Sequence, residues 1–87
     1  MKKQWFMYVV VCCDQTLYCG ITTDLSRRVK EHNTSIRGSK YTRARRPVSL
    51  IYTELHNDRS SASKAECAFK KLSKKNKMRI VDGNQNI

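Results

Sequence analysis

The stretch LYCGITTDLSRRVKEHN, residues 17–33, contains the change from strand to helix on which the fold depends. Residues 17–21 predict a short strand, and Gly20 inside it indicates a bulge or a close approach by another group. The threonines and the aspartate that follow, residues 22–24, offer side-chain oxygens of the kind that cap helices. We therefore expect a helix to start here and to run to about Ile36.

The segment before this stretch, WFMYVVVCC (residues 5–13), is rich in aromatic and β-branched residues and predicts a strand. Residues 14–16 suit a tight turn, so the two strands should form a hairpin. After the helix comes a loop dense in Lys and Arg, here named the cationic loop (residues 37–46), which Pro47 closes.

The rest of the chain predicts one more strand and two more helices. The strand is expected at residues 48–54, where apolar and polar residues alternate. Asp58 can cap a helix that runs through about Leu72, and a lysine-rich helix should cover residues 73–81. The expected fold class is α/β of the α+β kind, with three strands flanked by helices in the order β-β-α-β-α-α.

The length of the chain limits it to one domain. A protein of 87 residues buries only about 60% of the surface that its unfolded chain exposes, so the core must be thin. We expect that domain over residues 1–82 and a frayed polar tail over residues 83–87.

The charge indicates a polyanionic partner. Eighteen Lys and Arg residues stand against seven Asp and Glu residues, which gives a net charge of +11. So large an excess destabilises the compact state through self-repulsion, and binding to nucleic acid explains it better than solubility alone. DNA is favoured over RNA, and no membrane partner is expected.

The start of the chain, MKKQWFMYVVVCC, resembles a signal peptide only superficially. Its apolar run is short, is interrupted by Tyr8, and leads into Asp14 rather than a cleavage site of small residues. We interpret it as a buried strand and expect a cytoplasmic protein. The cysteines lack the C-x-x-C spacing of zinc sites, and the adjacent Cys12 and Cys13 should point to opposite faces of a strand. Reduced thiols without zinc are therefore expected.

The first predicted helix places two polar residues where apolar ones would be easier. Leu25, Val29 and Ile36 share one stripe at helical spacing. His32 falls on that stripe, and Arg28 lies at its margin. A histidine in such a position is usually a hydrogen-bonded core residue. An inward guanidinium is harder to accommodate, because it requires an anion.

Three further residues have both an ordinary and a functional interpretation. Glu66 borders the apolar arc of the second predicted helix, where it can form a simple i,i+4 pair with Lys70 or present a carboxylate beside Arg28. Tyr8 and Tyr18 can be core residues of the hairpin, but a phenol can also position or deprotonate a water. With an ordinary pKa of about 10, a tyrosine acts as a base only if nearby cations lower that pKa.

Together these residues resemble the GIY-YIG nuclease domain. The pattern is FMY (residues 6–8) and YCG (residues 18–20), followed by Arg28, His32 and Glu66. Only the tyrosines and the final glycine of the two family tripeptides are kept. The resemblance extends from residue 4 to about residue 81 and is strongest to small single-domain bacterial members of unassigned role. Many members carry a late asparagine, and Asn76 is not assigned to that position.

The resemblance implies a mixed three-stranded sheet flanked by helices and a nuclease that hydrolyses DNA phosphodiester bonds with one Mg²⁺ or Mn²⁺ ion. Glu66 would be the single protein carboxylate on the metal. Arg28 would offset charge on the phosphoryl oxygens, and Tyr8 would act as the base or hold the attacking water. His32 would assist proton movement, and Tyr18 would orient the water or the phosphate.

The cationic loop is the expected nucleic-acid contact, although solvated loops are often charged. Phosphates would meet its basic residues, and an unpaired base could stack on its tyrosine. The residues expected to bind are Arg37, Lys40, Tyr41, Arg43, Arg45 and Arg46. A second basic area covers residues 70–79. Neither area shows an order of residues suited to reading bases, so cleavage should be structure-directed or weakly sequence-specific.

Two other functions remain open from the sequence. A nucleic-acid-binding module of GIY-YIG fold without catalysis would explain the charge equally well, and so would a ribosome- or RNA-associated protein. A protein partner could also supply the specificity that the chain itself lacks.

Overall fold

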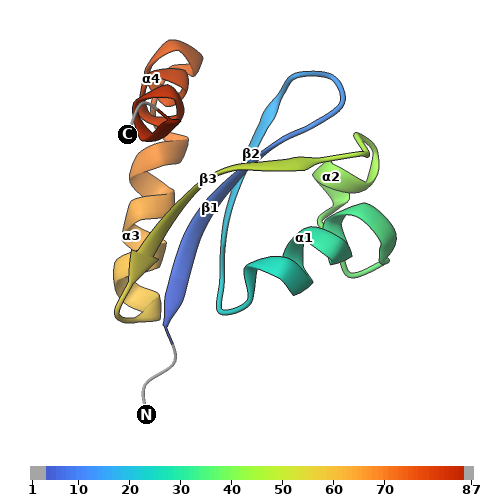
Figure 1. Cartoon of the computed structure of the whole chain (residues 1–87), viewed down its shortest axis with the longest axis horizontal. Helices are drawn as coiled ribbons and strands as arrows, with labels where there is room; N and C mark the ends of the chain where they lie inside the picture. Colours follow the sequence, from blue (N-terminus) through green and yellow to red (C-terminus); the bar gives the residue numbers. More distant parts are fainter. Residues whose placement is uncertain (1–3, 86–87) are drawn as a thin grey trace.

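The structure is a computed structural model that describes residues 4–85, and Figure 1 shows its course. A sheet lies in the middle, with α1 and α2 on one side and α3 and α4 on the other. The elements in chain order are β1 (Trp5–Val11), β2 (Leu17–Thr22), α1 (Leu25–Thr34), α2 (Lys40–Arg43), β3 (Ser49–His56), α3 (Arg59–Lys70) and α4 (Lys74–Gln85).

The predicted order of elements is confirmed, with one addition. The single-turn helix α2 forms inside the cationic loop, where Ser39 caps it by accepting a hydrogen bond from the Thr42 amide. The predicted caps of α1 and α3 are also present, because Asp24 and Asp58 accept bonds from backbone amides of the first turns. Helix α4 extends past the expected residues 73–81, and the last two residues of the expected tail lie outside the described part.

The sheet is antiparallel throughout, so the implied mixed sheet was wrong. The strand order is β2-β1-β3, and β1 pairs antiparallel with both neighbours. The reason is the path of the connection between β2 and β3. The cationic loop returns the chain to the end of β1, where the Cys13 amide donates to the Arg45 carbonyl at 3.0 Å. The strand β3 therefore starts beside the end of β1 and runs back along it.

Alternate residues of β1 point to different helices. Met7 and Val9 pack in one buried cluster with Phe69 of α3. Tyr8 and Val10 pack in a second cluster, together with residues of α1. The sheet thus separates two apolar layers. Side chains that contact Tyr8 must come from the α1 side of the sheet.

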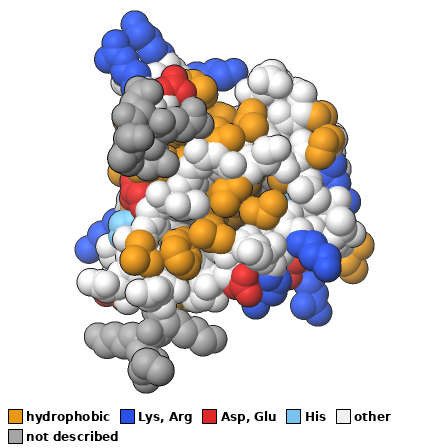
Figure 2. Space-filling model, viewed as in Figure 1, with side chains coloured by type: hydrophobic (Ala, Val, Ile, Leu, Met, Phe, Trp, Pro, Cys, Tyr) orange, Lys and Arg blue, Asp and Glu red, His pale blue; other side chains and the backbone are white. Residues whose placement is uncertain are grey.

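The surface combines a few exposed apolar side chains with many cationic ones. In the view of Figure 2, hydrophobic side chains occupy the middle of the face, and Lys and Arg lie mostly toward its outline. Ile36 and Leu55 are the most exposed of the large hydrophobic residues, at 86% and 57%. None of the helices described over residues 4–85 combines the length and the apolar character needed to cross a bilayer.

Candidate active site

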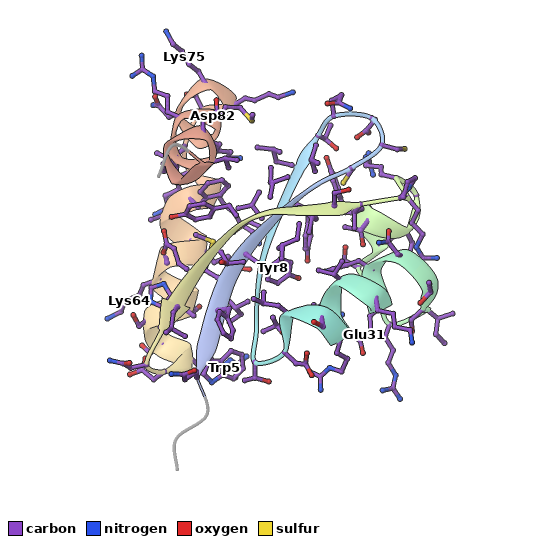
Figure 3. All side chains as sticks on the ribbon, viewed as in Figure 1. Trp5, Tyr8, Glu31, Lys64, Lys75 and Asp82 are labelled. Carbon is purple, nitrogen blue, oxygen red and sulfur yellow. The ribbon has the colours of Figure 1, made fainter. Side chains whose placement is uncertain are left out.

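The centre of the candidate site is a buried pair formed by a tyrosine of β1 and a histidine of α1. The Tyr8 hydroxyl lies 2.7 Å from His32 Nε2, and Figure 3 shows Tyr8 in the middle of the sheet. Tyr8 is 1% exposed and His32 is 0% exposed. The prediction that His32 faces inward is confirmed, and the phenol of Tyr8 is its partner. Neither group stands open to solvent.

Gly20 makes room for that pair. Gly20 of β2 lies directly opposite Tyr8 of β1 in the hairpin register. A Cβ atom at this position would lie 2.5 Å from the Tyr8 hydroxyl oxygen, which is closer than real contacts allow. The register of the β1–β2 pair is continuous at this point, so the glycine marks a close approach rather than a bulge.

Tyr18 lies on the same face of the sheet and contacts the same histidine. The ring centroids of Tyr18 and His32 are 5.3 Å apart in an edge-to-face arrangement. The other side of Tyr18 stacks on Tyr41 of α2 at 6.0 Å, and the Arg45 guanidinium lies over Tyr41 at 3.9 Å. Tyr18 is therefore a half-buried link between the buried pair and the cationic loop.

Arg28 completes this group from the margin of α1. Its Nη1 donates to the Glu31 carboxylate at 3.1 Å and to the Arg37 carbonyl at 2.8 Å. The anion that an inward guanidinium requires is therefore supplied in part by Glu31. The Arg28 side chain is still 24% exposed, so part of the guanidinium is accessible to a ligand.

Burial dominates the electrostatics of the buried pair. Burial raises the pKa of Tyr8 to about 12, and Arg28 offsets this only in part. Burial and the charge of Arg28 lower the pKa of His32 to about 4. Arg28 lowers the pKa of Tyr8, as expected of a nearby cation, but desolvation has the larger effect. At neutral pH both partners are uncharged.

Glu66 is not brought together with the other four predicted residues. It lies on α3, which packs against the opposite face of the sheet. Its side chain is 23% exposed, and its carboxylate pairs with Lys70 at 3.5 Å, the ordinary i,i+4 contact. The thiol of Cys19 on β2 has a pKa raised first by burial and then by the charge of Glu66. The carboxylate therefore lies near β2, the edge strand that also carries Tyr18.

The Glu66 carboxylate is suited to bind one hard cation, such as Mg²⁺, that is also bound by phosphate oxygens. Within residues 4–85 no group of three or more His, Cys, Asp or Glu side chains gathers to hold a metal. Magnesium does not need such a cage, because it keeps several waters and accepts one or two carboxylates together with phosphate oxygens. The partly exposed Glu66 fits that limited role.

Two arginines of the cationic loop form contacts within the protein, whereas the other basic residues of the loop are exposed. Arg46 donates to the carbonyls of His32, Ser35 and Glu31 at 2.5, 2.6 and 3.3 Å, so it caps the end of α1. Arg45 pairs with Asp14 at 3.0 Å and fastens the loop to the hairpin. Arg45 and Arg46 were predicted to contact phosphates, but each already has a structural role within the protein.

The outer members of the loop remain suited to a nucleic acid. Arg37, Lys40, Tyr41 and Arg43 are all exposed. Sequence reasoning missed Ser39 and Thr42 in the same loop, although Thr42 is fully buried and touches His32. The only signal in the sequence was the Ser-x-x-Thr spacing, which is compatible with a helix start and says nothing about a histidine.

An antiparallel hairpin with two tyrosines on one face, opposed by an arginine and a histidine of the next helix, defines the class as an α+β domain with a polar site on one face of its sheet. Residues 4–79 match the family model described as the GIY-YIG catalytic domain, and the chain belongs to this family. The resemblance stated from the motifs is thereby confirmed.

The chain is also similar to several UPF0213 proteins and to two solved structures. A UPF0213 protein of Desulfotalea psychrophila is 53% identical over 97% of this chain and 76% of its own length. A UPF0213 protein of Streptococcus agalactiae is 46% identical over 99% of this chain and 97% of its own length. The solution NMR structure of an E. faecalis protein is similar with a TM-score of 0.63 and 45% identity, covering 97% of this chain and 90% of the other. That of a Bacillus halodurans UPF0213 protein has a TM-score of 0.59 and 37% identity, covering 91% and 83%.

Proposed function

We propose that the protein is a metal-dependent endonuclease that hydrolyses DNA phosphodiester bonds in a structure-directed or weakly sequence-specific manner. The observation that carries this proposal is the grouping of Tyr8, Tyr18, Arg28 and His32, from three separate elements, on one face of the sheet. Family membership and the charge of +11 support it.

The buried pair suits the handling of a proton. A water held at the Tyr8 hydroxyl would attack phosphorus, while the proton displaced from Tyr8 would pass to His32 Nε2 at 2.7 Å. Tyr18 would orient the water or the phosphate from the exposed side. Arg28, with part of its guanidinium free, would offset the charge that develops on the phosphoryl oxygens.

Glu66 would hold the metal ion from the other side of β2. Because β2 is an edge strand, a phosphate lying against that edge has Tyr18 on one side of the strand and the α3 face on the other. A bound Mg²⁺ or Mn²⁺ would polarise the phosphate and stabilise the leaving 3′ oxygen. The pair between Glu66 and Lys70 is exposed enough to open for this purpose.

A second candidate function is a nucleic-acid-binding module without catalysis. One observation favours it, namely that Glu66 lies on the opposite face of the sheet and pairs with Lys70. This candidate keeps the cationic loop as the interface and assigns the Tyr8–His32 pair to the core.

The two candidates are separated by a cleavage assay on labelled duplex, single-stranded and branched DNA with Mg²⁺, with Mn²⁺ and with a chelator. We expect metal-dependent nicking, its loss in Glu66→Ala, and DNA binding that is largely unchanged. Asp82→Ala is the matched control, because it removes one exposed carboxylate from α4. Equal cleavage by wild type and Glu66→Ala would refute the nuclease assignment, and binding without cleavage on every substrate would favour the module.

A further inference from the structure

The single-turn helix α2 buries one polar residue against the candidate site. Thr42 is 0% exposed, and its hydroxyl oxygen lies 2.8 Å from Nδ1 of His32. The opposite ring nitrogen of His32 faces Tyr8 at 2.7 Å. Both nitrogens of a neutral imidazole thus have a partner, and the position of its one proton decides which nitrogen can accept another.

The Tyr8 end of the ring requires an accepting nitrogen. After burial, the largest effect on the Tyr8 hydroxyl comes from the guanidinium of Arg28, which carries donors and no acceptor. The hydroxyl can take a bond from Arg28 but must send its own proton elsewhere. Among the described residues, the hydrogen-bond partner of this hydroxyl is His32 Nε2. An unprotonated Nε2 accepts the proton of the buried Tyr8 hydroxyl. A protonated Nε2 would leave that hydroxyl proton without an acceptor.

The Thr42 end of the ring gives the same answer. The Thr42 hydroxyl donates its single proton to the Ser39 carbonyl at 3.1 Å. Its oxygen is then free to accept from His32 Nδ1 and from the Ser39 hydroxyl at 2.9 Å. The Ser39 amide also points toward Nδ1, but at 3.5 Å it is too distant to compete with the contact of 2.8 Å.

We propose that Thr42, held by Ser39, is a positioning residue that fixes His32 as the Nδ1–H tautomer and leaves Nε2 free to accept the proton of Tyr8. The depressed pKa of His32 agrees with a neutral ring in the resting protein. Because Ser39 and Thr42 belong to the cationic loop, the same short helix that exposes Lys40 and Arg43 also sets the state of the buried histidine.

The catalytic use of this tautomer rests on the proposed nuclease function. As the water oxygen bonds to phosphorus, the water gives one proton to the Tyr8 oxygen, and the Tyr8 proton passes to Nε2. The bond from phosphorus to the 3′ oxygen breaks, and that oxygen takes a proton from solvent water. His32 becomes an imidazolium whose Nδ1–H is still bonded to Thr42, and it later returns its proton to solvent. An Nε2–H tautomer could not accept the proton.

The tautomer is measured directly from the ¹⁵N chemical shifts of the His32 ring, whether or not the protein cleaves DNA. We expect a protonated Nδ1 and an unprotonated Nε2 in the wild type and in Thr42→Ser, which keeps the hydroxyl. In Thr42→Val, which is similar in shape but has no acceptor, the proton should shift to Nε2. An Nε2–H ring in the wild type, or unchanged shifts in Thr42→Val, would overturn the proposal.

Cleavage then tests the use of the tautomer. Thr42→Val should lower the single-turnover rate by about 10²-fold at unchanged DNA affinity, and Thr42→Ser should restore it. Equal rates for wild type and Thr42→Val would overturn the positioning role. If the wild type has the Nδ1–H ring but cleaves no substrate, the tautomer assignment is supported and the proposed nuclease function fails.

Discussion

At the scale of single residues, the site depends on how closely two strands approach. Tyr8 and Gly20 face each other across the hairpin, and the hydroxyl occupies the space that any larger residue would need. Spacing alone placed Tyr8 and Tyr18 on neighbouring strands and His32 on an inward stripe, and the resemblance to the family joined the three in one site. It could not show that burial would raise the tyrosine pKa, because the desolvation of a group depends on packing that no local pattern records.

Substitution of this glycine tests the close approach. Gly20→Ala should destabilise the fold by about 1–3 kcal/mol, because the new methyl group overlaps the Tyr8 ring. Gly83→Ala is the matched control. Gly83 lies in α4 with open space around it, so the same change should be neutral or stabilising by up to about 1 kcal/mol. Denaturant unfolding measures both, and equal effects at the two positions would contradict the packing described.

The buried histidine predicts a dependence of stability on pH. The pKa of His32 is about 4 in the folded protein and 6.5 as its ordinary value, so the unfolded chain binds the proton more readily. The free energy of unfolding therefore does not depend on His32 above pH 6.5. As the pH falls from 6.5 toward about 4, it decreases by about 3 kcal/mol in all. Unfolding of wild type and His32→Gln between pH 5 and 6.5 should show a steeper decline in the wild type. Parallel curves would show that His32 is not the group responsible.

At the scale of elements, the cationic loop is the part that the sequence described least well. Its composition predicted a nucleic-acid contact but concealed the helix α2 and the capping of α1 by Arg46. A run of cations cannot tell which members bind carbonyls and which face solvent, because that depends on the fold around them. The strands and longer helices were predictable, because their periodic patterns and caps act locally.

The division of the loop gives a prediction for DNA binding. Lys40→Ala with Arg43→Ala should reduce the slope of log affinity against log salt by about 2, since each lost phosphate contact removes about 0.9. The fold should keep its stability, because both side chains are exposed. The control, Lys30→Ala with Lys64→Ala, removes the same charge from exposed positions of α1 and α3, outside both basic areas; Figure 3 shows Lys64 pointing away from the sheet. If the two double variants changed the slope equally, only the overall charge would matter and the loop would not be the interface.

At the scale of the whole molecule, the sheet separates the proton-handling residues from the carboxylate. The sequence suggested that all five predicted residues meet, and the structure brings together four, with Glu66 on the opposite side. Helical periodicity shows which side of a helix faces inward but not which face of the sheet that helix covers. The edge strand β2 is the element that both sides share, and it is where we propose that the phosphate lies.

The central claim is that the Tyr8 hydroxyl takes part in phosphodiester hydrolysis. The most direct measurement is the single-turnover cleavage rate of wild type and Tyr8→Phe on the same labelled branched DNA with saturating Mg²⁺. Phe fills the same buried space and removes only the oxygen that bonds to His32. The account predicts a rate about 10²- to 10⁴-fold lower at unchanged DNA affinity. Equal rates for the two proteins would contradict it.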